Sequence, residues 1–340
     1  MERKKALKRW GIPMACAVIL LCIWGYLMLF SHTFNIEKPA GLYIDEDDTQ
    51  DSIRAKIEAT ARPGISSGFP LLSALNGYRV KSGYYSVEPD DNMFGLFRRL
   101  KQGRQTPIRL TIPSVRTMDR LSGVLGRKLM MDSATVARHL SDSAFCNRYG
   151  YNVNTIPCLF IPNTYEVYWN ISPEELMNRM KKENKAFWTD ERLHKAEITG
   201  LTPEEVVTLA SIIDEETANN AEKPMVAGMY LNRLRIGMPL QADPTVKFAW
   251  GDFSLRRIYH NHLQVESPYN TYRYAGLPPG PIRIPSIAGI EAVLNHVHHD
   301  YLYMCAKEDF SGTHNFARTY REHLANAARY TAALNQRNIR

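Results

Sequence analysis

The chain has 340 residues, of which 44% are hydrophobic and 23% are charged, a composition typical of folded protein and a length that allows two domains. Its net charge is +7, but +4 of this lies within the first ten residues, which leaves only +3 for the rest of the chain. No run of basic residues follows, so the composition argues against a nucleic-acid-binding protein.

A long apolar segment follows the basic amino terminus. Residues 11–36 contain no Asp, Glu, Lys or Arg and are long enough to cross a bilayer as a helix. A cleaved signal peptide, or a lipid attached at Cys16 or Cys22, is the alternative, but the segment is long and no A-x-A-like cleavage site follows it. The positive charge before the segment predicts a single transmembrane helix over 11–33, with residues 1–10 in the cytoplasm and the remainder outside it.

The region 34–150 alternates strand and helix patterns. Residues 84–87 read as a strand, and an apolar stripe over 93–100 reads as the helix after it. The same plan returns about 25 residues later, with a strand over 108–112 and a helix over 118–125. These repeats suggest a small α+β module that resembles LysM-type carbohydrate-binding folds, and a plain α+β packing domain is equally compatible with them.

The cysteines and histidines give weak signals for disulfides and metal binding. Cys146 and Cys158 lie twelve residues apart in a compartment that permits disulfides, and the sequence leaves open whether they pair. No C-x-x-C motif is present, and His298 and His299 are adjacent, so they cannot share one face of a helix. We therefore expect neither a metal nor another cofactor.

The most informative segment is 202–217. Thr202 is a typical helix N-cap, Pro203 is a typical first helical residue, and Glu205 completes a capping box. The pattern predicts an amphipathic helix that ends in three consecutive acidic residues. Its buried face comprises Val206, Leu209, Ala210, Ile213 and Thr217.

Glu216 lies inside the apolar arc of this helix, whereas Asp214 and Glu215 lie at its flanks. A carboxylate on an apolar face is costly unless it is paired, hydrogen-bonded or protonated. A carboxyl group that stays protonated at neutral pH can act as a general acid. The helix alone leaves open whether Glu216 is a catalytic acid or a helix-end residue held by an Arg or by backbone groups.

Beyond Gly237 the chain is rich in loops that contain polar clusters, and long ordered loops in compact domains are usually functional. The motifs G-x-S-x-G and H-E-x-x-H and the phosphate-binding glycine loop are absent, which argues against the enzyme classes that use them. The clusters span residues 241–245, 267–272, 276–281 and 312–316.

Several of these segments together resemble the endolytic murein transglycosylases, or YceG-like family, in the family's order along the chain. The matching blocks are Leu209-Ala-Ser-Ile-Ile-Asp-Glu-Glu-Thr217, residues 232–245, Tyr269-Asn-Thr-Tyr272, Gly276-Leu-Pro-Pro-Gly280 and His314-Asn-Phe316. The resemblance implies an α+β protein with one amino-terminal transmembrane helix. It also implies a small LysM-like α+β subdomain within 34–150 and a larger α+β catalytic domain over 151–340. Such a protein would sit in the bacterial inner membrane with its catalytic domain in the periplasm.

The same resemblance implies a lyase that acts on peptidoglycan. Members of the family cleave nascent glycan strands between N-acetylmuramic acid and N-acetylglucosamine, leave 1,6-anhydro ends and so limit strand length. One carboxyl group can serve this reaction, because the C6 hydroxyl of the sugar replaces water as the nucleophile. The resemblance selects Glu216, the residue that the helical pattern also selects.

The expected substrate-binding residues come from the loop clusters. Peptidoglycan glycan strands are the expected substrate, and cell-wall synthases are candidate protein partners. Two alternatives stay open: a muramidase-type hydrolase with Asp243 as a second carboxylate, and a non-catalytic peptidoglycan-binding protein. The residues expected to hold the glycan are Gln241, Asp243, Thr245, Tyr269, Asn270, Tyr272, His314 and Phe316.

Overall fold

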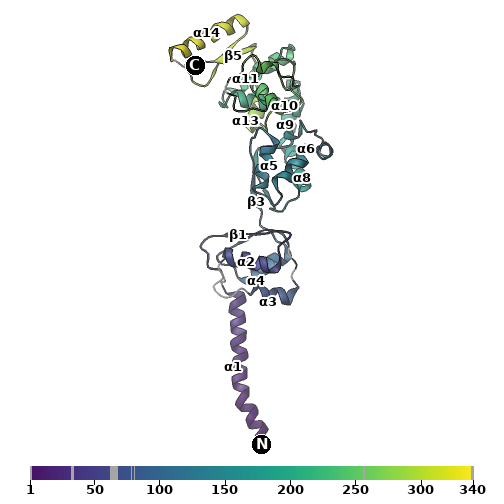
Figure 1. Cartoon of the computed structure of the whole chain (residues 1–340), viewed down its shortest axis with the longest axis vertical. Helices are drawn as coiled ribbons and strands as arrows, with labels where there is room; N and C mark the ends of the chain where they lie inside the picture. Colours follow the sequence, from purple (N-terminus) through teal and green to yellow (C-terminus); the bar gives the residue numbers. More distant parts are fainter. Residues whose placement is uncertain are drawn as a thin grey trace. The chain divides into compact units, whose positions relative to one another are not determined.

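The structure is a computed structural model of the chain (Figure 1). It describes residues 2–31, 34–61, 68–77, 79, 81–255 and 257–337, with side chains described from residue 12 onward and not at residue 61. The chain forms two compact units. Unit 1 comprises Met1–Leu110 and Glu166–Ile171, and unit 2 comprises Thr111–Tyr165 and Ser172–Arg340.

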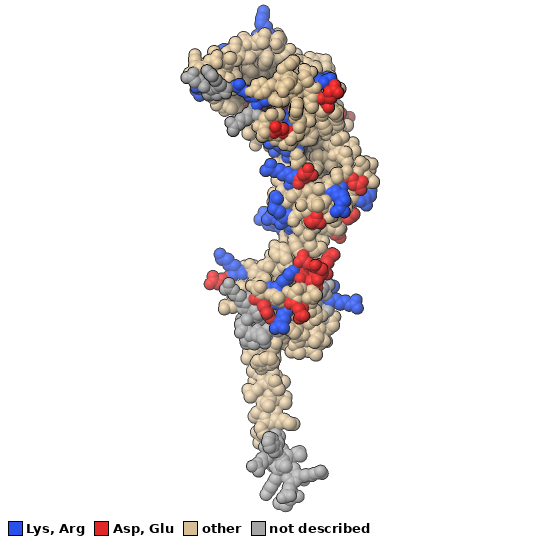
Figure 2. All heavy atoms as spheres, in the orientation of Figure 1, with Lys and Arg blue, Asp and Glu red and all other residues tan. Residues whose placement is uncertain are grey.

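Helix α1 (Glu2–Phe30) accounts for the apolar amino-terminal segment. Over Ile12–Phe30 its mean hydropathy is 2.3, and by length and composition it is the one helix in the described part of the chain suited to crossing a membrane. Figure 2 shows its described side chains without charge. The predicted membrane segment continues to residue 33, but α1 ends at Phe30, and residues 32 and 33 lie outside the described residues.

The rest of unit 1 packs helices on a two-stranded antiparallel sheet. Strands β1 and β2 pair from Ala40↔Val87 to Ile44↔Gly83, and their inward side chains, such as Leu42 and Tyr85, are buried against the helices. The strand and helix predicted over 84–87 and 93–100 are confirmed, whereas β1 was not predicted. The elements are β1 (Ala40–Ile44), α2 (Gln50–Ala61), α3 (Phe69–Asn76), β2 (Gly83–Val87) and α4 (Met93–Gln102).

A second small sheet lies where the chain passes from one unit to the other. It consists of β3 (Ile108–Ile112) and β4 (Asn163–Val167). The boundary between the two compact units falls within β3, between Leu110 and Thr111. The sequence instead predicts a functional boundary between residues 150 and 151. The functional division, and the likeness to LysM folds, stay predictions.

Unit 2 is mostly helical, and its core is built around α10 (Figure 1). Helices α10, α11 and α13 contact one another, and eight consecutive residues of α10, Val206 to Ile213, are buried. The sequence predicts that only one face of this helix is buried. That prediction is too narrow, because neighbouring helices cover α10 on its other sides as well. The helices are α5 (Met118–Gly126), α6 (Ser133–Ser141), α7 (Ser143–Arg148), α8 (Pro173–Phe187), α9 (Asp190–Thr199), α10 (Pro203–Glu216), α11 (Lys223–Arg235), α12 (Asp243–Trp250), α13 (Ile287–Leu294) and α14 (Tyr320–Gln336), with short 3-10 turns η1 (Ile156–Leu159) and η2 (His262–Gln264).

The last part of unit 2 is a β-hairpin followed by a helix. Strands β5 (Tyr303–Ala306) and β6 (His314–Ala317) pair antiparallel, and α14 packs against both of them. No residue of α14 is buried. With helices and two-stranded sheets in both units, the α+β class is confirmed.

The two cysteines whose pairing the sequence left open have separate surroundings. Cys146 and Cys158 are both buried free thiols in the structure. Cys146 Sγ lies 3.5 Å from the carbonyl oxygen of Leu140, whereas Cys158 belongs to the core around α10.

Candidate active site

Helix α10 carries the candidate catalytic residue at its last position. The predicted capping box is present: Thr202 Oγ1 accepts the N–H of Glu205 at 3.3 Å, and Glu205 Oε2 accepts the N–H of Thr202 at 2.8 Å. The helix ends at Glu216, and its last turn contains no basic residue. Asp214, Glu215 and Glu216 therefore face the negative end of the helix dipole and need partners from other segments.

Asp214 forms a buried ion pair. Its Oδ1 lies 2.7 Å from Nζ of Lys223, and the side chains of Asp214 and Lys223 are only 4% and 6% exposed. Ser286 donates its backbone N–H to Asp214 Oδ2 at 2.5 Å and its hydroxyl to Oδ1 at 3.0 Å. Because Ser286 is the N-cap of α13, Asp214 joins the end of α10 to the start of α13.

Glu215 is bound by two arginines. Arg116 donates Nε to Oε1 and Nη2 to Oε2, both at 2.8 Å, and Arg283 donates Nη1 to Oε1 at 2.8 Å. Burial alone would raise the pKa of Glu215, but the hydrogen bonds from Arg116 and the charge of Arg283 hold it below its ordinary value. Glu215 is therefore a permanently ionised structural carboxylate at neutral pH.

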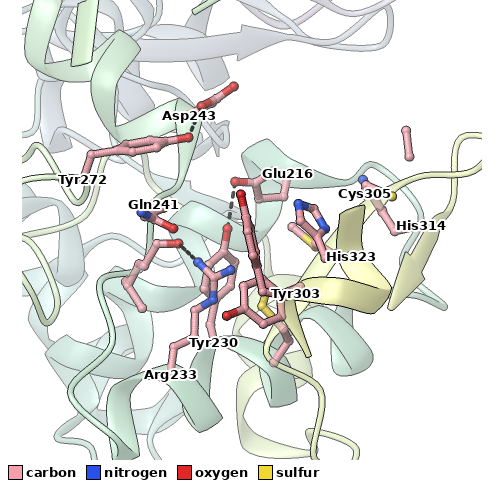
Figure 3. Close-up of a pocket in the computed structure, with 15 residues that line it drawn as sticks. Glu216, Tyr230, Arg233, Gln241, Asp243, Tyr272, Tyr303, Cys305, His314 and His323 are labelled. Carbon is pink, nitrogen blue, oxygen red and sulfur yellow. Dashed lines mark hydrogen bonds between the residues drawn. The ribbon is translucent and has the colours of Figure 1, made fainter. Parts of the chain in front are cut away.

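Glu216 is the one of the three acids without an ion-pair partner in the described part of the chain. The Tyr230 hydroxyl donates to its Oε1 at 2.9 Å (Figure 3). Burial raises the pKa of Glu216 to about 7; the bond from Tyr230 opposes this rise, and the negative charge of Asp243 adds to it. A large fraction of Glu216 is therefore protonated at neutral pH, as a general acid requires.

The pocket around Glu216 has a volume of about 350 Å³ and is built from distant segments of unit 2 (Figure 3). One wall comes from α11 and the loop before α12, and the opposite wall comes from the β5–β6 hairpin and α14. Its polar and aromatic lining includes Glu216, Tyr230, Arg233, Gln241, Asp243, Tyr272, Tyr303, His314, Tyr320 and His323.

The loop before α12 presents two of the predicted site residues. Gln241 has a φ of 51°, which is unfavourable for a residue with a side chain, and its N–H donates to the carbonyl of Thr271 at 3.1 Å. Asp243, the first residue of α12, accepts a hydrogen bond from the Tyr272 hydroxyl at 2.6 Å. The strained turn and this bond fix both side chains at the pocket.

The pocket therefore brings together five of the nine predicted site residues: Glu216, Gln241, Asp243, Tyr272 and His314.

The other four do not line it. Thr245 and Asn270 are completely buried: the Thr245 hydroxyl bonds within the loop, and Asn270 Nδ2 donates to two backbone carbonyls at 2.9 Å each. The Tyr269 ring packs on Phe248, and Phe316 packs among the rings of the core. Thr245 and Asn270 therefore support the loops, Tyr269 and Phe316 pack on the core, and none of the four lines the pocket, although the sequence predicts that they contact the substrate.

Several lining residues were not predicted from the sequence. Tyr230 lies in the middle of α11 and Arg233 lies in its last turn, and the spacing of the two does not distinguish them from ordinary helix residues. Arg233 donates to the carbonyls of Leu302 at 2.6 Å and Leu240 at 2.7 Å, so it joins both walls of the pocket. The ring of Tyr303 lies under its guanidinium at 5.5 Å.

His314 is held by a carboxylate that was also not predicted. Glu222 Oε1 accepts the backbone N–H of His314 at 2.6 Å, and Oε2 lies 2.9 Å from its Nδ1. The side chains of His314 and Glu222 are 16% and 8% exposed. Glu222 precedes α11, so this pair attaches β6 to the same helix that supplies Tyr230.

The side chains that could coordinate a metal ion were also compared with this arrangement. Within the described residues, no group of three or more His, Cys, Asp and Glu side chains is placed to hold a metal ion. Of the histidines considered from the sequence, His299 bonds to the backbone carbonyl of Met225 at 2.9 Å, and His296 lies 3.1 Å from that of Val293.

Residues 42–329 match the profile of the YceG-like family. The chain belongs to this family. A relative from Bacillus subtilis (strain 168), an endolytic murein transglycosylase, is 26% identical over 323 residues, which cover 90% of this chain and 87% of the relative. An endolytic murein transglycosylase of Streptococcus pneumoniae (strain R6) is 25% identical, and the match covers 87% of this chain and 59% of that longer protein.

The fold of this YceG-like protein is also found in a solved structure. A crystal structure of a yceG-like protein from Listeria monocytogenes superposes with a TM-score of 0.56 at 26% identity. The match covers 85% of this chain and 99% of the Listeria chain.

Proposed function

We propose that this YceG-like protein is a membrane-anchored endolytic lytic transglycosylase of peptidoglycan. It cleaves nascent glycan strands between N-acetylmuramic acid and N-acetylglucosamine and leaves 1,6-anhydro-N-acetylmuramic acid ends, which limits strand length. The single observation that carries this proposal is Glu216, a carboxyl group with a pKa of about 7 at the floor of a polar pocket, next to two carboxylates that are bound by cations.

Glu216 acts first as an acid and then as a base. The protonated carboxyl donates its proton to the glycosidic oxygen, and the bond from that oxygen to C1 of the muramic acid breaks. The C6 hydroxyl of the same sugar then bonds to C1, and the Glu216 carboxylate takes up the proton that the hydroxyl loses. The proton balance closes, and no water is consumed.

The remaining pocket residues bind and orient the sugar. Tyr230 fixes one carboxyl oxygen of Glu216, so the other oxygen is available to the glycosidic bond. Asp243 is a negative charge near the carbon that becomes positive in the transition state, and Tyr272 holds it in place. Gln241 and His314 offer hydrogen bonds to hydroxyl and amide groups of the glycan.

A muramidase-type hydrolase is the second candidate, because Asp243 lines the same pocket as Glu216 and could activate water. The products distinguish the two reactions. Purified protein should be incubated with uncrosslinked peptidoglycan strands in H₂¹⁸O, and the new ends should be identified by mass spectrometry. Anhydro ends without ¹⁸O support the transglycosylase, whereas ¹⁸O-labelled reducing ends would replace it with the hydrolase. Binding without any cleavage would leave a non-catalytic wall-binding protein.

The cellular arrangement belongs to the same proposal. Helix α1 anchors the protein in the bacterial inner membrane by a single pass, with residues 1–10 in the cytoplasm and the catalytic domain in the periplasm; the excess of positive charge before the helix supports this orientation. Residues 34–150 would supply a LysM-like module, residues 151–340 the catalytic domain, and cell-wall synthases would be protein partners. A reporter fused after Arg340 should be active only outside the cytoplasm, and activity inside it would overturn the orientation.

A further inference from the structure

The outer side of α12 forms a stripe that begins in the catalytic pocket. Asp243, Lys247 and Trp250 occupy positions i, i+4 and i+7, so they lie along one side of the helix. Asp243 lines the pocket, and the charge of Lys247 acts on Glu216. Trp250 is the last residue of the helix and lies about 10 Å from Asp243 along the helix axis.

Two large aromatic side chains are exposed at the far end of this stripe. Trp250 is 47% exposed and Tyr259 is 59% exposed. His262 lies against both rings, with ring centroids 5.4 Å from Trp250 and 5.8 Å from Tyr259. The backbone N–H of Tyr259 donates to His262 Nδ1 at 3.0 Å, which ties the loop together.

The indole of Trp250 is held in one orientation. Its Nε1–H donates to the carbonyl of His262 at 3.0 Å, and the His262 ring meets it at 79°. With this contact in place Trp250 is still 47% exposed, so part of the indole stays open to a ligand. A fixed ring loses little conformational entropy when a ligand stacks on it.

An exposed, fixed indole face suits a sugar ring. The π face carries partial negative charge and attracts the C–H groups on one face of a pyranose, while the hydroxyls around the sugar stay in water. Trp250 and Tyr259 both contact the His262 ring and so form one exposed aromatic patch, and contiguous apolar patches mark interaction or ligand-binding sites. The continuity with the pocket identifies the occupant: a ligand that reaches from Asp243 to Trp250 is linear and extends about 10 Å along α12.

We propose that Trp250, flanked by Tyr259, is a stacking subsite for a sugar ring of the same glycan strand that is cleaved at Glu216. This subsite rests on the proposed function, because that function makes a glycan the occupant of the pocket. It lies away from the scissile bond, so it adds affinity for long strands and does not take part in the chemistry.

The test compares Trp250→Leu with Trp250→Tyr in the full-length protein. Both variants lose the indole N–H bond to His262, but only the Tyr variant keeps an aromatic face. The substrates are peptide-free, uncrosslinked glycan strands separated by length. We expect Trp250→Leu to raise KM for long strands about tenfold and Trp250→Tyr to raise it no more than about twofold. The shortest fragment that the wild-type protein cleaves should be processed equally by all three.

The outcomes separate this subsite from other roles of Trp250. An equal loss on short and long strands, or a lowered melting temperature in Trp250→Leu alone, would show that Trp250 positions α12 and would overturn the subsite. An unchanged KM for long strands in Trp250→Leu would also overturn the subsite, and the aromatic patch would then be a candidate surface for a protein partner. If the wild-type protein cleaves nothing, the proposed function fails, and binding of the same strands decides the subsite: Glu216→Gln should then bind them more tightly than Glu216→Gln combined with Trp250→Leu.

Discussion

Replacing Glu216 by Gln tests both the catalytic assignment and its physical basis. Gln has the same shape as protonated Glu, and its side-chain oxygen can still accept the hydrogen bond that Tyr230 donates at 2.9 Å. It cannot deliver a proton to the glycosidic oxygen. Loss of a general acid costs on the order of 10²–10⁴ in rate, so we expect cleavage to fall by that factor without loss of the fold.

The stability of the Gln variant should depend on pH in a predictable direction. The pKa of Glu216 rises from its ordinary value of 4.5 to about 7 on folding, so the folded state keeps this proton where the unfolded state has lost it. The stability that this proton contributes is fully present below pH 4.5 and is lost as pH rises through 7. The loss reaches at most about 3 kcal/mol. Gln does not titrate, so Glu216→Gln does not lose this stability. The unfolding free energy of the variant minus that of the wild type should therefore increase as pH rises from 4.5 to 7.

The assay combines product analysis with melting temperatures, and Glu215→Gln is the matched control. For a unit of this size, 1 kcal/mol corresponds to roughly 2–4 °C. Glu215 has a lowered pKa, so its stabilising effect is present at neutral pH and is lost as pH falls through that pKa. Glu215→Gln should therefore destabilise the protein most at neutral pH, which is the opposite of the trend for Glu216→Gln. It should also retain much more activity than Glu216→Gln.

Two results would refute this reasoning. If Glu216→Gln still forms anhydro ends at nearly the wild-type rate while Glu215→Gln does not, the catalytic residue has been assigned to the wrong carboxylate. If the melting temperature of Glu216→Gln relative to wild type is the same at pH 5 and pH 8, burial does not raise the pKa of Glu216.

Three further substitutions test the surroundings of the site. Tyr230→Phe removes the bond that lowers the pKa of Glu216, the proposed catalytic acid, so the alkaline limb of the pH–rate profile should move to higher pH; an unchanged limb would contradict this role. Asp214→Asn leaves the buried ammonium of Lys223 without its carboxylate and should cost about 3–5 kcal/mol in chemical denaturation, with most activity per folded molecule retained. His314→Ala should lower kcat/KM far more than His298→Ala, and EDTA should change neither rate; a chelator-sensitive activity restored by zinc would show that a metal takes part.

The fold could be predicted best where local signals decide it. The capping box of Thr202 and Glu205 forms as expected, because both partners lie within one turn of the same helix. The burial of α10 on all sides could not be predicted, since residues such as Val207 and Ser211 are covered by helices from distant parts of the sequence. Strand β1 was missed because five residues with one Gly give little pattern.

The site shows the same limit. Gln241, Asp243 and Tyr272 belong to polar clusters in the loop-rich region beyond Gly237, which made them candidates, and they do meet in the pocket. Thr245 and Asn270 come from the same loops, but their polar groups bond to the loops themselves, and sequence does not distinguish a residue that binds substrate from one that holds a loop.

Of the opposite wall of the pocket, only His314 was predicted among the lining residues. Tyr303 and His323 reach the pocket only because the β5–β6 hairpin places α14 across from α11. Such a long-range arrangement leaves no trace in local spacing.

The two carboxylates before Glu216 also bear on motion at the end of α10. Helix ends normally fray, and the negative charges of Asp214 and Glu215 at the C-terminus favour fraying further. Asp214 is joined to α11 and to the start of α13, and Glu215 is bound by two arginines, so this turn is tethered on both sides. We therefore expect the backbone amides of the last turn to exchange hydrogen as slowly as those in the middle of the helix. The carboxyl group of Glu216 is then held at a fixed position in the pocket, so the proposed proton transfers need no ordering of the helix end.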